Sequence, residues 1–598
     1  MAPKSGKKSK QTATNPTQPE INPNSSFTPE SFEQELKALA AKAKDETWTR
    51  YAAEQAAVYF KSITVLTLIA VYSNASQLAL SPVYGSIPTS RWHTYVVIAA
   101  CFTGWSSNLY LDRVLPFKPA KLLPIIAICI PTIQFFLYRF SGTLTAYWGP
   151  LVTEMLTFYP LMSISVACVA TYLDDIDLSR LPRWMAGSAP GLGSYVFYLA
   201  VETLFARLLP TYAGKSFFNT RVGIELALAA SYALFAPSKY LVGMSSLMLL
   251  HTALFNTHVQ TPMALSSLNV SLAKTGWAII DRQESLTGYI SVIESLDQGF
   301  RAMRCDHSLL GGEWVRFQRE GPLADNRVAE PIYGVFAMLE AVRLVKVPHP
   351  VPDEDARALV IGMGIGTTPA ALVAHGIDTT VVEIDPVVYE FASKYFMLPS
   401  NHTGVIEDAV TYAARRANSS SSRESFDYII HDVFTGGAEP VALFTLEFLQ
   451  NLDALLKVGG VIAINYAGDF ALPPPGVIVN TIRHVFPSCR VFREHEYDEK
   501  TGQGKQDFAN MVIFCTKLGN KKLAFREPTA QDLLNSPARE AFLMPRYEVT
   551  DKDLVVGAGE GILTSNDTQK LVKWHETSAL GHWAVMRVVL PDTVWVNW

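Results

Sequence analysis

The sequence predicts an α-helical polytopic membrane domain followed by an α/β domain built on a parallel sheet. Two observations predict this combination. Long apolar runs fill residues 62–257, whereas short strands and helices alternate regularly from residue 357 onward. Of the 598 residues, 49% are hydrophobic and only 18% are charged, against about 25% charged in typical soluble domains. This composition excludes a simple soluble enzyme, and also a disordered or collagen-like chain.

The apolar runs have the lengths of membrane-spanning helices, for which roughly 20 residues suffice. Each run has no charged residue or a single glutamate. They are residues 62–90, 92–111, 122–138, 149–172, 190–205, 222–236 and 240–273. One such run could be a buried core helix, but six or seven in series predict six to eight spans in a lipid bilayer. The glutamates within them, Glu154, Glu202 and Glu225, are either functional or paired inside the helix bundle.

The N-terminal residues 1–61 precede the apolar runs. Residues 1–29 read as a disordered basic tail with four lysines and no apolar stretch of a signal peptide, and a soluble helix follows up to residue 61. Basic residues also occur in the loops 112–121 and 173–185, so positive-inside logic places the tail and these loops in the cytosol. Six or eight spans then put the C-terminal half in the cytosol, whereas seven put it outside.

The six cysteines are scattered, without a CxxC pair or a metal-ligand spacing. We expect free thiols, no disulfide framework and no metal site. The net charge of −5 gives no indication of nucleic-acid binding, which usually requires an excess of basic residues.

The C-terminal half divides into three pieces. Residues 278–345 read as short strands with turns, a small β-hairpin region that ends in a helix at about 331–345. Residues 346–520 form the α/β domain, with strands at 358–362, 379–385, 404–408, 426–432 and 460–466 and a closing strand pair. We expect the last piece, 521–598, to be an extension whose C-terminal helix packs on the α/β domain.

Glycines and acids follow the first four strands of this domain, at the edge where open α/β sheets bind ligands. In chain order they are Gly362, Gly364 and Gly366, then Glu383 and Asp385, then Glu407 and Asp408, and finally Asp432. Glu383 comes 21 residues after Gly362, where an acid can accept both hydroxyls of a ribose. The turn lacks the Gly-Lys-Ser/Thr of ATP-binding loops, and Thr367 replaces the last glycine of an NAD fingerprint. The pattern predicts a different nucleoside ligand.

These motifs resemble the class I methyltransferase (Rossmann-like) fold and, within it, the spermidine synthase family of aminopropyltransferases. The matching segments are Glu330-Pro-Ile-Tyr333, Val382-Glu383-Ile-Asp385, Ile406-Glu407-Asp408-Ala409 and Tyr428-Ile-Ile-His-Asp432. The whole chain looks like the fungal group of multi-pass, spermidine synthase-like proteins. The resemblance implies S-adenosylmethionine or its decarboxylated form as co-substrate. It implies Asp432 and Tyr333 as catalytic residues, and the glycines with Glu383, Asp385, Glu407 and Asp408 as nucleoside-binding residues.

The sequence departs from that family on the side of the amine acceptor. Ile365 stands where the glycine loop has an aspartate, and Thr435 replaces the second diamine-binding acid. Leu310 and Ile290 replace two glutamines. The nucleoside side is therefore kept, while the diamine side is largely lost.

Three functional hypotheses remain open. The first is a membrane-anchored aminopropyltransferase acting on a small-molecule amine, with Asp432 as the base. The second is an S-adenosylmethionine-dependent methyltransferase with a lipidic or protein acceptor. The third is a non-catalytic nucleoside or polyamine sensor or carrier, and a homo-oligomer is left open for all three. Because both forms of the co-substrate are made in the cytosol, we expect the catalytic-like domain to face it. A glycan at the sequon Asn401 would contradict this placement.

Overall fold

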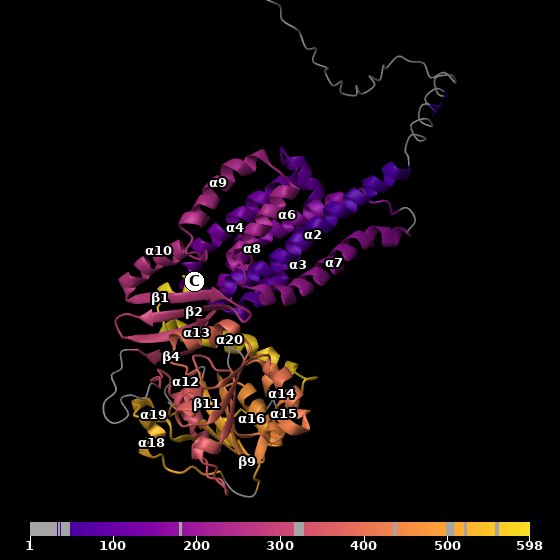
Figure 1. The fold of residues 1–598 in the computed structure, drawn as a ribbon. Coiled ribbons are helices and arrows are strands. Elements are labelled where there is room, and N and C mark those ends of the chain that lie inside the picture. The colour runs from indigo at the N-terminus through magenta and orange to yellow at the C-terminus, as the bar shows by residue number, and fades with distance from the viewer. Residues whose placement is uncertain are drawn as a thin grey trace, which may run out of the picture.

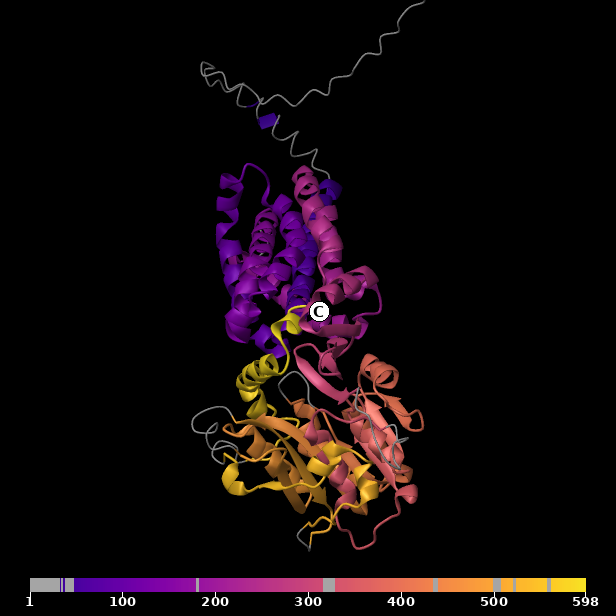
Figure 2. The ribbon, with the colours of Figure 1, turned by 90° about the vertical axis from the view of Figure 1, so that its left-hand side faces the viewer.

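The computed structural model describes residues 33, 36, 37, 48–178, 182–315, 328–433, 439–497, 507–519, 523–555 and 561–598. A helical part and an α/β part lie one beyond the other, and a small antiparallel sheet lies between them (Figure 1). The last long helix, α20 (Gln569–Val589), also lies at the junction of the two parts (Figure 2). The predicted tail, residues 1–29, falls outside the described residues.

The helical part begins with one long helix. Residues 48–61, expected as a separate soluble helix, are the first turns of α2 (Trp48–Tyr84), which runs on without a break into the first apolar run. The helices that follow are α3 (Ser86–Val114), α4 (Leu123–Tyr138), α5 (Ser141–Leu156), α6 (Phe158–Leu173), α7 (Arg183–Tyr212), α8 (Arg221–Phe235), α9 (Lys239–Leu254) and α10 (Pro262–Leu272). The bundle packs around a buried cluster that includes Tyr72, Phe158 and Tyr232.

Fewer helices have the length and apolar character of a membrane span than the six to eight expected. Within the described ranges, three helices qualify, at Arg50–Tyr84, Pro119–Tyr138 and Trp184–Tyr212. A fourth is added if α5 and α6, bent by 41° at their junction, count as one span. Helices α8 and α9 do not qualify because they have only 15 and 16 residues, short of the roughly 20 that cross a bilayer. Helix α3 has 29 residues but is not apolar enough to qualify.

The β-rich region is a four-stranded antiparallel meander rather than a single hairpin. Its strands are β1 (Trp277–Glu284), β2 (Tyr289–Ser295), β3 (Phe300–Cys305) and β4 (Ser308–Trp314), paired in chain order. The short helix α11 (Gly334–Leu339) and a 3-10 turn at Glu340–Leu344 supply the helix expected at 331–345.

The α/β part has an eight-stranded sheet in the order β12-β10-β11-β9-β8-β5-β6-β7. Its strands are β5 (Arg357–Ile361), β6 (Asp378–Glu383), β7 (Thr403–Ile406), β8 (Phe426–His431), β9 (Leu456–Asp469), β10 (Ser488–Arg493), β11 (Phe508–Thr516) and β12 (Tyr547–Val549). Its helices are α12 (Thr367–Ala374), α13 (Pro386–Tyr395), α14 (Ala409–Ala417), α15 (Leu446–Leu455) and α16 (Pro474–Val485). The five strands β9, β8, β5, β6 and β7 run parallel to one another, as predicted. Strands β10, β11 and β12 pair antiparallel, so the sheet is mixed.

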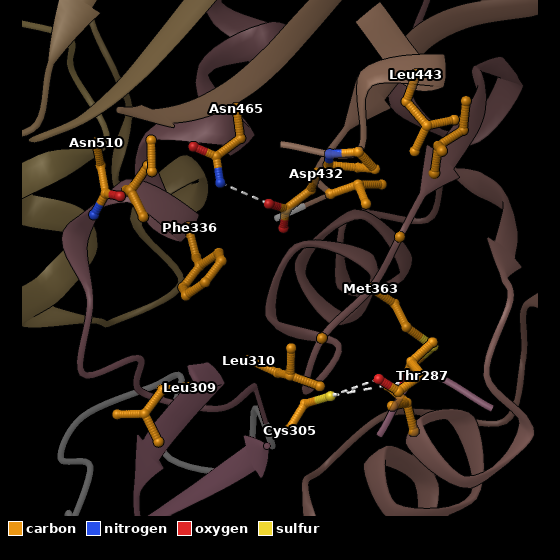
Figure 3. Close-up of a pocket in the computed structure, with 18 of the residues that line it drawn as sticks. Thr287, Cys305, Leu309, Leu310, Phe336, Met363, Asp432, Leu443, Asn465 and Asn510 are labelled. Carbon is orange, nitrogen blue, oxygen red and sulfur yellow. Dashed lines mark hydrogen bonds between the residues drawn. The ribbon is translucent and has the colours of Figure 1, made fainter. Parts of the chain in front are cut away.

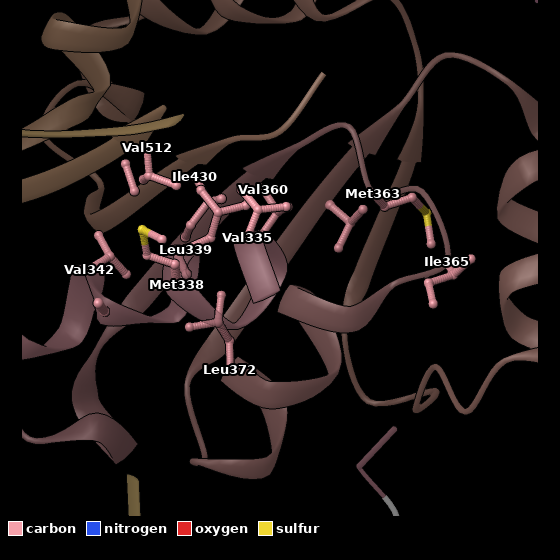
Figure 4. Close-up of a cluster of buried hydrophobic side chains, with 14 of the residues drawn as sticks. Val335, Met338, Leu339, Val342, Val360, Met363, Ile365, Leu372, Ile430 and Val512 are labelled. Atoms are coloured by element: carbon pink, nitrogen blue, oxygen red, sulfur yellow. The ribbon is translucent and has the colours of Figure 1, made fainter. Parts of the chain in front are cut away.

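The core lies on both faces of this sheet, because successive side chains of a strand point to opposite faces. On β5, Val360 packs with Leu339, Leu372 and Val512 on one face (Figure 4). Its neighbours Leu359 and Ile361 belong to the cluster on the other face. The buried strands are fixed from both sides, which holds their carboxyl ends in register.

The C-terminal residues do more than pack on the α/β part. Here α18 (Ala530–Leu533) and α19 (Pro537–Phe542) precede β12, and α21 (Asp592–Trp595) follows α20. On α20, the indole Nε1 of Trp583 donates a 3.0 Å hydrogen bond to the carbonyl of Val83, and Arg587 bonds to Ser141. The extension therefore fastens the α/β part to the helical part.

The prediction of free thiols is wrong for one pair of cysteines. Cys489 and Cys515 face each other on the antiparallel strands β10 and β11 and form a disulfide. Their 26-residue separation gave no sign of this, because strand register sets the pairing. The remaining four cysteines are free thiols.

Candidate active site

A cavity of about 460 Å³ opens at the carboxyl ends of the parallel strands. Its wall combines the turn after β5, the ends of β6, β8 and β9, strand β11 and helix α20 (Figure 3). Of the residues predicted for the site, Tyr333, Gly362, Gly364, Glu383, Asp408 and Asp432 line it, whereas Gly366, Asp385 and Glu407 do not. This is the sheet edge predicted for the ligand.

The glycine turn after β5 requires glycine at two positions. Gly362 has a φ of +72°, and a Cβ there would lie 2.3 Å from the carbonyl oxygen of Asp432. Gly364 has a φ of +52°, and a Cβ would lie 2.2 Å from the carbonyl oxygen of Leu310. Both the backbone conformation and the lack of space exclude larger residues. The turn therefore packs closely against the backbone of Asp432 and Leu310 while it lines the cavity.

Glu383 is the buried acid next to this turn. One of its carboxylate oxygens accepts the backbone N–H of Met363 at 3.2 Å, and the other accepts that of Asp385 at 3.0 Å. Burial raises the pKa of Glu383 to about 7. These contacts fix a carboxylate at the cavity wall that retains acceptor capacity for the hydroxyls of a ribose.

The two acids that do not line the cavity have structural contacts. Asp385 accepts the backbone N–H of Val387 at the start of α13, and the hydroxyls of Ser285 and Thr287, both at 2.6 Å. It thereby ties the turn between β1 and β2 to the sheet. Glu407 pairs with Arg415 at 2.7 Å.

Asp408 lines the cavity while also capping α14, whose residue Thr411 donates its backbone N–H at 2.9 Å. Gly366 caps α12 with a φ of +89°. Both residues serve the helices that bound the site.

Asp432 directly follows β8 and lines the cavity. The side-chain amide of Asn465 on β9 donates a 2.8 Å hydrogen bond to its Oδ1 (Figure 3). Burial raises the pKa of Asp432 to about 6, and this hydrogen bond limits the rise. A carboxylate held in this way can orient an N–H group of an acceptor and accept its proton.

Tyr333 faces the same cavity from the residues just before α11. Its hydroxyl is buried and has no hydrogen-bond partner among the described residues. Burial raises its pKa to about 12, and the charge of Glu494 adds to the rise. The phenol therefore remains protonated and available as a hydrogen-bond donor.

Sequence reasoning missed several residues of the wall. Asn465 and Asn510 come from β9 and β11, and helix α20 contributes His582, Val585, Met586 and Val589. A single asparagine in the apolar strand 461–467 was a weak signal for Asn465. No local motif marks α20, which reaches the cavity only through tertiary packing.

The residues present fit a nucleoside carrying an adenosyl group. The glycine turn offers a close backbone floor, and Glu383 offers a buried acceptor for ribose hydroxyls. Apolar side chains that include Val410 and Leu443 line the part next to Asp408. No group of three or more metal-ligating side chains occurs within the part of the chain that the structure describes.

The fold and the site together define a nucleoside-binding protein of the class I methyltransferase and spermidine synthase type. The model of the spermine/spermidine synthase domain matches residues 339–492. The N-terminal histidine N-methyltransferase of Emericella nidulans is 45% identical over 545 residues, 89% of this chain and 96% of that protein. The chain belongs to the family of this methyltransferase.

More distant similarities cover less than half of the chain. A polyamine aminopropyltransferase of Vibrio vulnificus is 34% identical over 191 residues, 31% of this chain, and the match spans 58% of that enzyme. A probable spermidine synthase from Corynebacterium glutamicum, a solved structure, is 16% identical with a TM-score of 0.33, covering 47% of this chain and 99% of that one.

Proposed function

We propose that this protein methylates the imidazole of an N-terminal histidine on a protein acceptor. S-adenosylmethionine is the co-substrate and supplies an activated methyl group on a sulfonium. The activity of the Emericella nidulans relative, which is similar over nearly its whole length, supports the acceptor. This is the second of the three sequence hypotheses, and the comparisons favour it over aminopropyl transfer.

One observation in the site carries the proposal: the Asp432 carboxylate, whose pKa burial raises to about 6, lines the cavity and is held by a hydrogen bond from Asn465. A neutral imidazole has one N–H and one nitrogen lone pair. If Asp432 accepts the N–H, the ring is held in one tautomer with its lone pair directed toward the methyl group. Alignment of the two reacting groups then supplies most of the rate enhancement.

The wall of the cavity also explains why a diamine is a poorer acceptor. Three carboxylates line it within the described ranges, Glu383, Asp408 and Asp432, and the first two lie on the nucleoside side. Thr435, the replacement for the second diamine acid, lies outside the described residues. Asp432 is therefore the single carboxylate of the described lining on the acceptor side, so a protonated diamine would lack direct contact with a second acid for its other charge, which is costly to bury.

The helical part is proposed to lie in a membrane, with the α/β part facing the cytosol. The three long apolar helices support this placement. On α7, apolar side chains are widely exposed, with Trp184 75% and Val196 64% accessible. Such a surface is typical of contact with lipid or a partner protein. Flotation with liposomes tests whether the helical part binds a membrane. A glycan at the exposed Asn401 would contradict the cytosolic orientation of the α/β part.

The activity is tested with the full-length protein, S-adenosylmethionine and a peptide that begins with histidine. We expect one methyl group on the imidazole, located by fragmentation mass spectrometry, and no product from the same peptide with phenylalanine at its first position. A parallel reaction with decarboxylated S-adenosylmethionine and putrescine should give no spermidine. Spermidine formation without peptide methylation would return the aminopropyltransferase hypothesis to first place.

A further inference from the structure

Polar side chains form a row across four neighbouring strands, leading away from the nucleoside side of the cavity. Asp432 follows β8, Asn465 lies on β9, Asn510 lies on β11 and Glu494 follows β10. The amide of Asn465 donates to Asp432 at 2.8 Å, and the amide of Asn510 donates to Glu494, also at 2.8 Å. In Figure 3, Asn465 and Asn510 lie on the opposite side of the cavity from Met363 and Thr287.

Glu494 ends this row as a buried carboxylate without a strong counter-charge. It accepts the backbone N–H of Val335 at 3.0 Å and the amide of Asn510, and its side chain is 8% exposed. Among the described residues its only ionic neighbour is the exposed His495, at 3.9 Å. A buried carboxylate of this kind is stabilised by a cation that enters its surroundings.

The groups between Glu494 and the cavity are suited to an ammonium group. The amide nitrogen of Asn510 is directed to Glu494, so its carbonyl oxygen is left to accept a hydrogen bond. The side-chain oxygen of Asn465 is buried and has no partner within the part of the chain that the structure describes. Tyr333 adds a hydroxyl that is also without a partner there and that lies in the field of Glu494.

We propose that this end of the cavity binds the α-ammonium group of the acceptor polypeptide, with Glu494 supplying the compensating charge through Asn510. The inference rests on the proposed function and extends it: the enzyme requires a free N-terminal amine, in addition to histidine at the first position. Glu494 is thus a specificity-determining residue that stands behind the cavity wall.

Asn465 and Asn510 lie on the two strands that follow β8 in the sheet, and neighbouring strands are about 4.8 Å apart. Asn465 is next to Asp432, whereas Asn510 pairs with Ala467, two residues farther along β9. When Asp432 holds the imidazole N–H, the α-amine of the same residue is one side-chain length away. It then reaches the amide oxygens rather than the nucleoside side.

The test compares two peptides that both begin with histidine, one with a free α-amine and one N-acetylated. For the native full-length protein we expect KM to be about 10- to 100-fold lower for the free amine. This is the range expected when the ammonium group of the peptide is attracted to the carboxylate of Glu494. Glu494→Gln should remove most of this preference by raising KM for the free amine, with little change in kcat. KM for the acetylated peptide should stay the same.

Glu496→Gln is the matched control, because Glu496 is exposed two residues further along the same segment and loses the same charge. Binding of S-adenosylmethionine, measured by calorimetry, reports whether each variant is folded. Methylation of both peptides with equal KM by the native protein, or an unchanged preference in a folded Glu494→Gln, would overturn the inference while leaving the proposed function intact. Methylation of neither peptide would instead count against the proposed function itself.

Discussion

The side-chain amide of Asn465 donates a 2.8 Å hydrogen bond to the carboxylate of Asp432 from the neighbouring strand. The sequence motif identifies Asp432 as a site residue, but it does not identify Asn465. Because the amide favours the ionised carboxylate, it keeps the pKa of Asp432 lower than burial alone would. The pKa of Asp432, which follows β8, therefore depends on a residue of β9.

Asp432→Asn should lower the rate of methyl transfer about 10²- to 10⁴-fold, the usual contribution of a positioned proton acceptor. The variant keeps the size of the side chain, so binding of S-adenosylmethionine should be unchanged. Single-turnover rates and calorimetry measure the two properties separately. A variant that binds the co-substrate and keeps its rate would show that Asp432 has no part in the reaction.

The reaction should slow as the pH falls below about 6, because Asp432 must be ionised to accept an N–H and its pKa is raised to about 6. Replacing Asn465 by leucine removes the hydrogen bond that favours the ionised form, so the acidic limb of the pH profile should move to higher pH. The peptide imidazole also titrates in this region, but it is identical in both profiles. The difference between the two profiles therefore reports on the enzyme alone, and coincident limbs would contradict the assignment.

Affinity for S-adenosylmethionine should rise as the pH is raised through about 7. Burial raises the pKa of Glu383 to about 7, and ribose hydroxyls that donate to its carboxylate favour the ionised form, so binding releases a proton below that pH. Calorimetry in buffers of different ionisation enthalpy detects this release. Glu383→Gln should bind more weakly and without the pH dependence, whereas a release that persists in this variant would have to come from another group.

Gly364→Ala should lower affinity for S-adenosylmethionine by at least about tenfold and destabilise the protein by about 1–3 kcal/mol. Alanine is strained at a φ of +52°, and its Cβ would collide with the carbonyl of Leu310. Gly459→Ala is the control, because no atom lies within 4 Å of a Cβ at Gly459. Thermal unfolding with and without the co-substrate distinguishes the two variants. Equal behaviour of both would show that the turn can relax.

Trp583→Ala should raise KM for the peptide without changing affinity for S-adenosylmethionine. Trp583 anchors α20 through its bond to Val83, and α20 forms part of the cavity wall. Loss of a buried tryptophan costs about 3–5 kcal/mol in a well-packed site. Val588→Ala, at an 87% exposed position of the same helix, should leave both parameters unchanged. If Trp583→Ala weakened binding of the peptide and of S-adenosylmethionine alike, the result would indicate general unfolding instead.

The sequence identifies the nucleoside half of the site because its signals are local. A glycine turn and an acid after a strand can be read from a few consecutive residues, and Gly362, Gly364, Glu383 and Asp432 lie in the cavity as predicted. The same reading includes Asp385, whose carboxylate is instead occupied by α13 and the β1–β2 turn. An acid that binds a ligand and one that caps a helix look alike in sequence.

The acceptor half could not be predicted in this way. Asn510 reaches the cavity because β11 returns antiparallel beside β9, and Glu494 reaches Asn510 through the pairing of β10 with β11. The same strand register creates the unpredicted disulfide. These contacts depend on which strands become neighbours. The span count stays a prediction: hydropathy marks apolar stretches in the sequence, but it does not show that the helices there, such as α8 and α9, have only 15 and 16 residues.

Helix α20 also imposes an order on biosynthesis. The glycine turn, Glu383 and Asp432 all leave the ribosome well before residues 569–589, so the nucleoside half can fold while the wall that carries His582 and Met586 is still untranslated. A nascent chain that is stopped in that interval lacks the part of the cavity wall that α20 supplies. The wall of the cavity is thus complete only when α20 docks onto both parts of the protein.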